Sequence, residues 1–232
     1  MEGENLKIVN DFKNVFIKGD KREIAKFIKY PLPRRSPIPS IDTPEDLVRR
    51  FEEVFDNKLS NMIKNSNINK DWHEVGWRGI MLKNGALWMD FDGKVRLVIY
   101  QSDFEKALRN KLIESDRKKI HKSLKVFNEP VLDWKTKRFR IRIDETGKRK
   151  YRYAAWPKDK SPLTKPDLIL INGKSIRVSS GGDHLYEFKN GNYTYKVYVY
   201  VVASDKNPIG VLEVYKKDKQ VLSESFIEKM NP

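Results

Sequence analysis

The feature that most constrains the fold is a change in hydrophobic periodicity along the chain. Up to about residue 64, apolar residues recur at spacings of three and four, which places them on one face of a helix. From about residue 124 onward, short apolar segments alternate with turn signals such as Asn-Gly and Gly-Gly, a rhythm typical of short antiparallel strands. The sequence therefore predicts an α+β protein with a helix-led first half and a β-rich second half.

The first half is expected to contain three helices. The first carries apolar residues at helical offsets: Val9, Phe12, Val15 and Phe16. A second, short helix must stop by Tyr30, because Pro31 disfavours helical backbone in the residue before it. After a proline-rich connection, Thr43 and Pro44 are a strong start signal for one long helix that continues to about residue 64.

The middle of the chain predicts a small antiparallel meander followed by another helix. Its three strands are expected at 73–82, 86–91 and 94–101, with a hairpin turn at Asp92-Gly93. Residues 102–123 return to helical spacing, with Ser102 or Asp103 as the cap. We place a domain boundary at this point, so that residues 1–101 form one domain and residues 102–232 form a linker helix and a basic β-rich domain.

The second half is expected to form a β-sandwich or a small barrel. Its candidate strands are 124–128, 136–144, 149–156, 167–172, 174–179, 184–189, 192–203, 210–216 and 219–225. The stretch Ser179–His184 places Ser, Asp and His close together in sequence, but a diglycine turn explains it better than a catalytic triad, whose members come from distant segments.

Composition excludes several classes of protein. The chain has 26 aromatic residues (11 Phe, 10 Tyr and 5 Trp), enough for a core and against wholesale disorder. It has no cysteine, so disulfides, thiol nucleophiles and cysteine metal sites are excluded. The longest apolar run, Val197 to Ala203, is seven residues, whereas a membrane-spanning helix needs about 20.

The first half also resembles a known superfamily. Two stretches carry the resemblance: Gly19-Asp20-Lys21 through Tyr30-Pro31-Leu32, and Trp77-Arg78-Gly79-Ile80 with the Asn84-Gly85 and Leu87-Trp88 that follow. They look like uncharacterised bacterial exported members of the nuclear transport factor two-like (cystatin-like cone) superfamily, over about residues 5–101. The resemblance implies a curved antiparallel sheet wrapped on helices, often enclosing a pocket, and an exported protein whose leader has been removed. No catalytic set of the family maps onto this chain, and the fold alone does not choose a function.

Three indoles lie close together in the first half, at Trp72, Trp77 and Trp88. They are candidates for the lining of a ligand pocket, since such pockets are mostly apolar with a few polar groups. The alternative is that they fill the core of the small sheet.

Asp90 and His73, with Tyr30 as a hydrogen-bond donor, are candidates for acid–base catalysis in the first half. Loop carboxylates are more often simply solvated, so this set is the weaker interpretation. The three histidines, His73, His121 and His184, are far apart in sequence and none has a partner at metal-ligand spacing, so we expect neither a metal nor another cofactor.

The sharpest feature is a concentration of positive charge in the second half. Residues 1–101 carry a net charge of +3, residues 102–232 carry +12, and residues 117–152 alone carry 14 basic and 4 acidic residues. Arg138, Arg140 and Arg142 alternate with apolar residues and so share one face of a strand, and Lys150 and Arg152 continue the pattern after a turn. Such a basic ribbon is a candidate site for an anionic ligand or an acidic protein. A solvated outer face of a hairpin is the alternative.

The leading hypothesis is a non-enzymatic binding module that engages a ligand or an anionic partner. A small-molecule isomerase or hydratase with a pocket in the first half is an alternative, and an immunity or inhibitor protein is another. Specific nucleic-acid binding is not favoured, because the chain contains no helix-turn-helix, zinc-finger or similar module.

Overall fold

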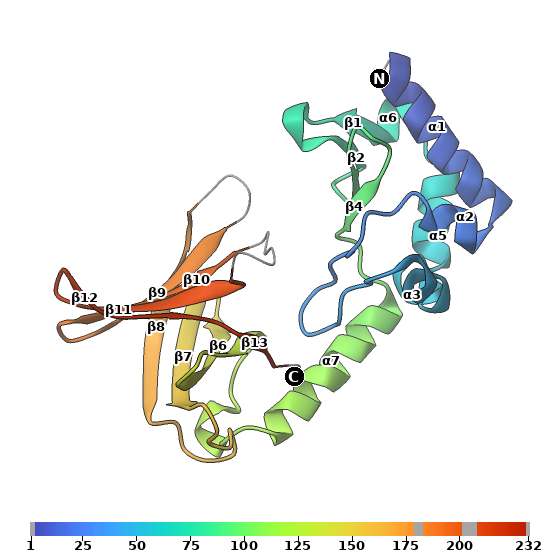
Figure 1. The fold of residues 1–232 in the computed structure, drawn as a ribbon. Coiled ribbons are helices and arrows are strands. Elements are labelled where there is room, and N and C mark those ends of the chain that lie inside the picture. The colour runs from blue at the N-terminus through green and yellow to red at the C-terminus, as the bar shows by residue number, and fades with distance from the viewer. Residues whose placement is uncertain (1–2, 179–182, 201–207, 231–232) are drawn as a thin grey trace. The chain divides into compact units, whose positions relative to one another are not determined.

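The computed structural model describes residues 3–178, 183–200 and 208–230, and the chain folds as two compact units, Met1–Lys111 and Leu112–Pro232 (Figure 1). The expected α+β class with a curved antiparallel sheet is confirmed. None of the helices in the described part of the chain is both long and apolar enough to cross a membrane. The predicted diglycine turn at 181–182 and the end of the strand predicted over 192–203 lie outside the described residues.

The first unit begins with six helical segments. They are α1 (Gly3–Lys18), α2 (Lys21–Ala25), α3 (Pro44–Arg49), α4 (Phe51–Val54), α5 (Asn57–Lys64) and α6 (Ile68–Asp71). Side-chain caps start several of them: Asp20 accepts hydrogen bonds from the amides of Arg22 and Glu23, and Thr43 accepts one from the amide of Asp46.

The single long helix expected over residues 44–64 is wrong, because the backbone leaves the helical conformation twice. Arg50 (φ −102°, ψ 19°) ends α3, and Phe55 (φ −107°, ψ 63°) ends α4. Asp56 then caps α5 by accepting a hydrogen bond from the Leu59 amide at 2.8 Å. The apolar spacing that predicted one helix remains, since Phe51, Phe55 and Leu59 are all buried.

A four-stranded antiparallel sheet completes the first unit. Its strands, in spatial order, are β1 (Trp72–Glu74), β2 (Ile80–Leu82), β3 (Leu87–Met89) and β4 (Val95–Val98). The strand predicted over 73–82 is thus two strands, separated by the 3₁₀ turn η1 (Gly76–Arg78). Gly79 closes this turn at φ +86°, where a Cβ would lie 2.2 Å from the Met89 carbonyl oxygen, so only glycine fits.

One face of this sheet packs on the helices to form the core of the first unit. Trp72, Leu82 and Leu87 are buried on that face together with Phe12 and Phe16 of α1. The proline-rich connection is held by the buried side chain of Arg34. Its guanidinium pairs with the buried Glu105 carboxylate (Nε–Oε1, 2.5 Å) and donates to the Val98 carbonyl at 2.7 Å.

The boundary between the units falls within helix α7 (Asp103–Lys118), which Ser102 caps by accepting a hydrogen bond from the Glu105 amide at 3.0 Å. In its described residues, the second unit then has a 3₁₀ turn, η2 (Lys122–Leu124), and nine strands. These are β5 (Glu129–Lys135), β6 (Phe139–Gly147), β7 (Lys150–Pro157), β8 (Leu168–Arg177), β9 (His184–Asn190), β10 (Tyr193–Val199), β11 (Gly210–Lys216), β12 (Lys219–Ser225) and β13 (Glu228–Lys229).

The nine strands form one antiparallel sheet that curls strongly on itself, as a half-barrel (Figure 1). Its order is β12-β11-β10-β9-β8-β7-β6-β5-β13, so consecutive strands are neighbours except at the last step. After β12 at one edge, the chain crosses to the other edge, where β13 pairs with β5. Phe226 makes this crossing and packs edge-to-face on Trp134 of β5, with ring centroids 5.3 Å apart. The C-terminal segment thereby draws the two edges of the sheet toward each other.

Two predicted elements of the second half are corrected. The strand expected at 124–128 is displaced, because η2 (Lys122–Leu124) occupies its start and β5 begins only at Glu129. The turn expected at Asn172-Gly173 is a bend within β8: residues before it pair with β7 and residues after it pair with β9. Gly173 is required at this bend, because a Cβ would lie 2.1 Å from the Phe188 ring.

Candidate functional site

The predicted basic ribbon does not exist as a continuous exposed surface. Arg142 is 1% exposed and Arg152 is 6% exposed, so both guanidinium groups are removed from solvent. They belong to a buried ion-pair cluster that we define as Asp116, Arg142, Asp144 and Arg152. The cluster holds two cations and two anions, so its charges balance.

The Arg142 guanidinium lies at the centre of the buried ion-pair cluster. It donates from Nη1 to Asp116 Oδ1 at 2.9 Å and from Nε to Asp144 Oδ1 at 2.8 Å. Burial by itself lowers the pKa of Arg142, but the Asp144 and Asp116 carboxylates more than offset this and raise it. The group is therefore a permanent cation whose charge is used inside the protein.

The second arginine of the cluster fixes the segment that follows α7. Arg152 donates from Nη2 to Asp144 Oδ2 at 2.6 Å and to the Leu124 carbonyl at 2.6 Å, and from Nη1 to the Val126 carbonyl at 3.1 Å. Because Asp116 is in α7, the cluster attaches the end of this helix and the η2 turn to the outer face of β6 and β7. Its role is structural.

Of the remaining residues of the predicted ribbon, some form ion pairs and some are exposed to solvent. Arg140 forms a bidentate pair with Asp133 of β5, at 2.8 Å and 2.7 Å. Arg138 has a side chain that is 61% exposed and pairs with Glu224, and Lys150 is exposed at the start of β7. Three aspartates explain why the predicted ribbon is not a row of solvated cations. Asp116, Asp133 and Asp144 reach the same face of the sheet and pair with arginines that the alternating sequence pattern placed in solvent.

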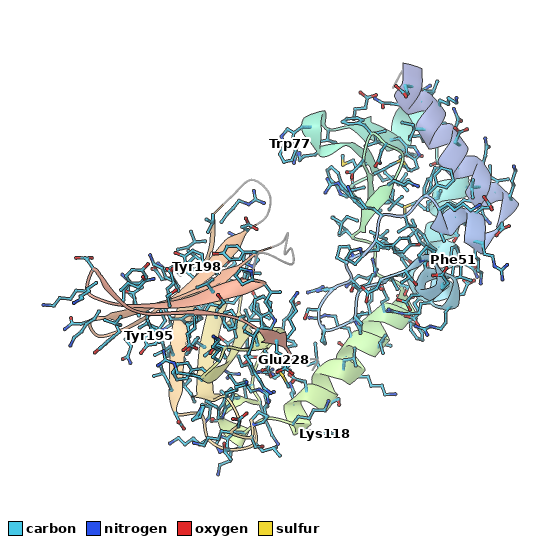
Figure 2. All side chains as sticks on the ribbon, viewed as in Figure 1. Phe51, Trp77, Lys118, Tyr195, Tyr198 and Glu228 are labelled. Atoms are coloured by element: carbon cyan, nitrogen blue, oxygen red, sulfur yellow. The ribbon has the colours of Figure 1, made fainter. Side chains whose placement is uncertain are left out.

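The three indoles of the first unit are not brought together around a cavity. Trp72 is buried in the core, where its Nε1 donates to Ser66 Oγ at 2.8 Å. Trp88 is half-buried on the opposite face of the small sheet, with the Arg96 guanidinium 5.9 Å from its ring centroid. Trp77 is 80% exposed on the η1 turn, and Figure 2 shows its side chain extending away from the strands.

Of the three acid–base candidates of the first unit, Asp90 and Tyr30 each have their own partners. Asp90 pairs with Lys29 at 2.9 Å and with Arg96 at 2.7 Å. His73 is exposed on β1. The Tyr30 hydroxyl donates to the Ala25 carbonyl at 3.1 Å, and burial raises the pKa of Tyr30 to about 12. None of these contacts joins two of the three candidate residues.

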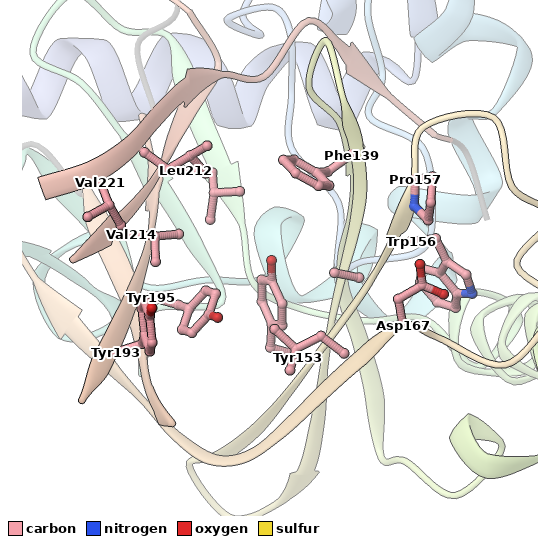
Figure 3. A pocket seen from close by; sticks show the side chains of 13 residues that line it. Phe139, Tyr153, Trp156, Pro157, Asp167, Tyr193, Tyr195, Leu212, Val214 and Val221 are labelled. Atoms are coloured by element: carbon pink, nitrogen blue, oxygen red, sulfur yellow. The ribbon is translucent and has the colours of Figure 1, made fainter. Parts of the chain in front are cut away.

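A cavity lined mainly by apolar and aromatic side chains lies in the second unit, on the inner face of the curled sheet (Figure 3). Its volume is about 400 Å³, which is in the range typical of small-molecule sites. The residues that line it are Phe139, Tyr153, Ala155, Trp156, Pro157, Asp167, Leu168, Tyr193, Tyr195, Leu212, Val214, Val221 and Leu222. Except for Asp167 in the β7–β8 connection, they come from β6, β7, β8, β10, β11 and β12, so the curl of the sheet itself creates the cavity.

Three tyrosines contribute hydroxyl groups to the cavity wall. Tyr153 on β7 and Tyr195 on β10 face each other with ring centroids 5.7 Å apart, and Tyr193 lies next to Tyr195 on the same side of β10. Figure 3 shows the Tyr153 and Tyr195 hydroxyl groups pointing into the cavity. Burial raises the pKa of both phenols, with a smaller contribution from the neighbouring tyrosine. Both therefore stay protonated at neutral pH and can donate hydrogen bonds.

Charged side chains surround the mouth of the cavity. The Arg138 guanidinium lies 5.4 Å from the Phe139 ring centroid, and the Lys216 ammonium lies 5.6 Å from that of Tyr193. The carboxylate of Asp167 at the edge of the cavity is paired with Lys160 at 2.5 Å. The mouth is thus cationic, while the interior is apolar and phenolic.

Sequence reasoning missed the cavity, although a signal for it was present. Tyr151, Tyr153 and Ala155 alternate along one strand, and Tyr193 and Tyr195 do so along another. Alternation places each set on one face of its strand, but only the curl brings the two faces together. Within residues 3–178, 183–200 and 208–230, no three carboxylate or imidazole groups lie close enough to hold a metal ion.

Comparison of the chain with protein-family models, with curated proteins and with solved structures finds no match. The resemblance of residues 5–101 to the nuclear transport factor two-like superfamily therefore stays a prediction from the sequence.

Proposed function

We propose that the second unit is a binding module for a small, largely apolar molecule held inside the curled sheet. The observation that carries this proposal is the cavity of about 400 Å³ with its wall of aliphatic side chains and tyrosines. Apolar walls with a few fixed polar groups are the usual composition of ligand sites, and a curled or closed sheet is a common way to build one.

Binding, rather than chemistry, is supported by the groups in the wall. The Tyr153 and Tyr195 phenols have raised pKa values, so they are poor bases at neutral pH. The one carboxylate among the lining residues, Asp167, is paired with Lys160. The site offers shape, apolar surface and hydrogen-bond donors, which are the requirements for holding a molecule.

The proposal is tested by blocking the mouth of the cavity without disturbing the core. Val221 lines the cavity and is 51% exposed, so Val221→Trp adds an indole at the mouth with little cost to packing. Val178 is the matched control, because it is 53% exposed and lies outside the lining set. The probe is the neutral dye N-phenyl-1-naphthylamine, whose fluorescence increases in an apolar site.

We expect saturable binding of one dye per chain to the parent protein and to Val178→Trp, and a loss of affinity of at least about tenfold in Val221→Trp, the equivalent of roughly 1.4 kcal/mol. Near-ultraviolet circular dichroism checks that both variants keep the parent fold. The proposal fails if the dye does not bind saturably, or if the two tryptophan variants bind it equally well.

A further inference from the structure

The loops at one end of the curled sheet determine what charge a ligand meets as it enters. In an antiparallel meander, the connections that follow alternate strands lie at the same end. Here these are the connections β5–β6, β7–β8, β9–β10 and β11–β12, which span residues 136–138, 158–167, 191–192 and 217–218. The cavity is built at this end, since Phe139, Pro157, Leu168 and Tyr193 are the strand-terminal residues next to these connections.

These connections are basic. They contain six lysines and arginines against three aspartates, a net charge of +3, and Lys216 and Lys219 flank the last of them. Asp167, the one carboxylate among the lining residues, is paired with Lys160, and Glu224 is paired through its Oε1 with Arg138. Lys216 is exposed and lies over the Tyr193 ring, and no ion pair to it is found among the described residues. A cation at the rim is thus available to an incoming anion.

The polar groups inside the cavity also favour a ligand with hydrogen-bond acceptors over a cationic one. Tyr153 and Tyr195 direct hydroxyl groups into the cavity, and protonated phenols donate hydrogen bonds to carboxylate and carbonyl oxygens. The rest of the wall is apolar, with Leu212 and Val214 opposite Phe139. An amine would meet a cationic rim and a wall without a free carboxylate, so a positively charged ligand is disfavoured.

We infer that the ligand is an amphipathic carboxylic acid, with its apolar body inside the sheet and its carboxylate at the mouth beside Lys216. This inference rests on the proposed function, because it assigns a chemical class to the occupant of the same cavity. The apolar body supplies most of the affinity, and the acid fixes the orientation.

The test compares three probes that each have twelve carbon atoms but differ in head group: dodecanoate, dodecanol and dodecylamine. Each is titrated, below its aggregation concentration, against the full-length protein carrying N-phenyl-1-naphthylamine, and its affinity is obtained from dye displacement. We expect dodecanoate to bind at least about fivefold tighter than dodecanol, because one attractive charge pair in a solvent-exposed setting contributes about 1 kcal/mol, which corresponds to about that ratio of dissociation constants. Dodecylamine should bind weakest of the three.

Two variants locate the head group. Lys216→Gln should weaken dodecanoate about fivefold and leave dodecanol unchanged, whereas Lys148→Gln, in the β6–β7 turn at the other end of the strands, should change neither. The inference is overturned if dodecanol or dodecylamine binds as tightly as dodecanoate, or if the two glutamine variants behave alike. In those cases dodecanol remains sensitive to Val221→Trp and the proposed cavity function survives. If no probe displaces the dye, or if Val221→Trp weakens the binding of none of them, the proposed cavity function itself fails.

Discussion

Removing the central arginine of the buried ion-pair cluster gives the sharpest test of the structure. Arg142 is 1% exposed, Asp116 is 3% exposed and Asp144 is 1% exposed. In Arg142→Met, Asp144 keeps its pair with Arg152 at 2.6 Å, but Asp116 loses the guanidinium that binds it. One carboxylate is then buried without a partner.

The magnitude follows from that uncompensated charge. Breaking a buried ion pair by removing one partner typically costs about 3–5 kcal/mol. With a urea dependence of about 2 kcal/mol per molar, this lowers the unfolding midpoint of the second unit by about 2 M. Lys150→Met is the control from the same predicted ribbon. It removes an exposed cation and should change stability by no more than about 0.5 kcal/mol.

The measurement must report on the second unit alone, because the chain has two compact units. Native-state hydrogen exchange of the β6 and β7 amides at low urea does this, since the slowest amides report the opening free energy of their own unit. A second variant separates charge from volume: Arg142→Met combined with Asp116→Leu should recover most of the loss, because it removes the orphaned carboxylate. A loss below about 1 kcal/mol in Arg142→Met, or no recovery in the double variant, would show that the cluster does not hold the unit together.

Two further predictions concern packing and pH. Gly173→Ala places a methyl group against the Phe188 ring, at 2.1 Å before relaxation, and should lower the free energy of unfolding by about 1–3 kcal/mol. Gly147→Ala, whose nearest neighbour is at 3.8 Å, should be close to neutral in the same urea titration, and equal effects would contradict the assigned bend of β8. Burial raises the pKa of Tyr30 to about 12, and burial together with a hydrogen bond to Asp56 raises that of Tyr100 to about 12. Since the unfolded phenols ionise near pH 10, the unfolded state holds fewer protons above that pH, so the contribution of these two phenols to stability should be constant below pH 10 and decrease from pH 10 to 12. Urea midpoints measured from pH 8 to 12 check this, and a midpoint that does not change would refute it.

Much of the local structure could be predicted because local interactions determine it. Helix α1 follows from the spacing of Val9, Phe12 and Phe16, and α3 starts at Thr43 as its cap predicts. The boundaries failed where competing local signals were present, as at Asp56, which starts a new helix within a continuous apolar pattern. Helix propensity and apolar periodicity do not tell which of two competing signals, a continuing helix or a new cap, determines the backbone.

The candidate site was harder to predict than the strands that build it. The alternation of Tyr193 and Tyr195 was visible, and β10 lies where the sequence predicts a strand. What alternation cannot tell is which other strand faces these rings, because the contact with Tyr153 joins residues about forty positions apart. The cavity depends on the curl of the sheet and on the crossing of the chain at Phe226, which are properties of the whole unit.

By itself, the sequence determined that the chain is α+β, that its second half is made of short antiparallel strands, and that arginines alternate along β6. Period, caps and turn residues act within a few positions of one another, so they can be read along the chain. Only the tertiary structure decided that Arg142 is buried and that the tyrosines share a cavity. Asp116 and Arg142 are 26 residues apart, and their pairing at 2.9 Å exists only when α7 and β6 come together. An arginine on an alternating strand looks the same in sequence whether water or a distant carboxylate neutralises it.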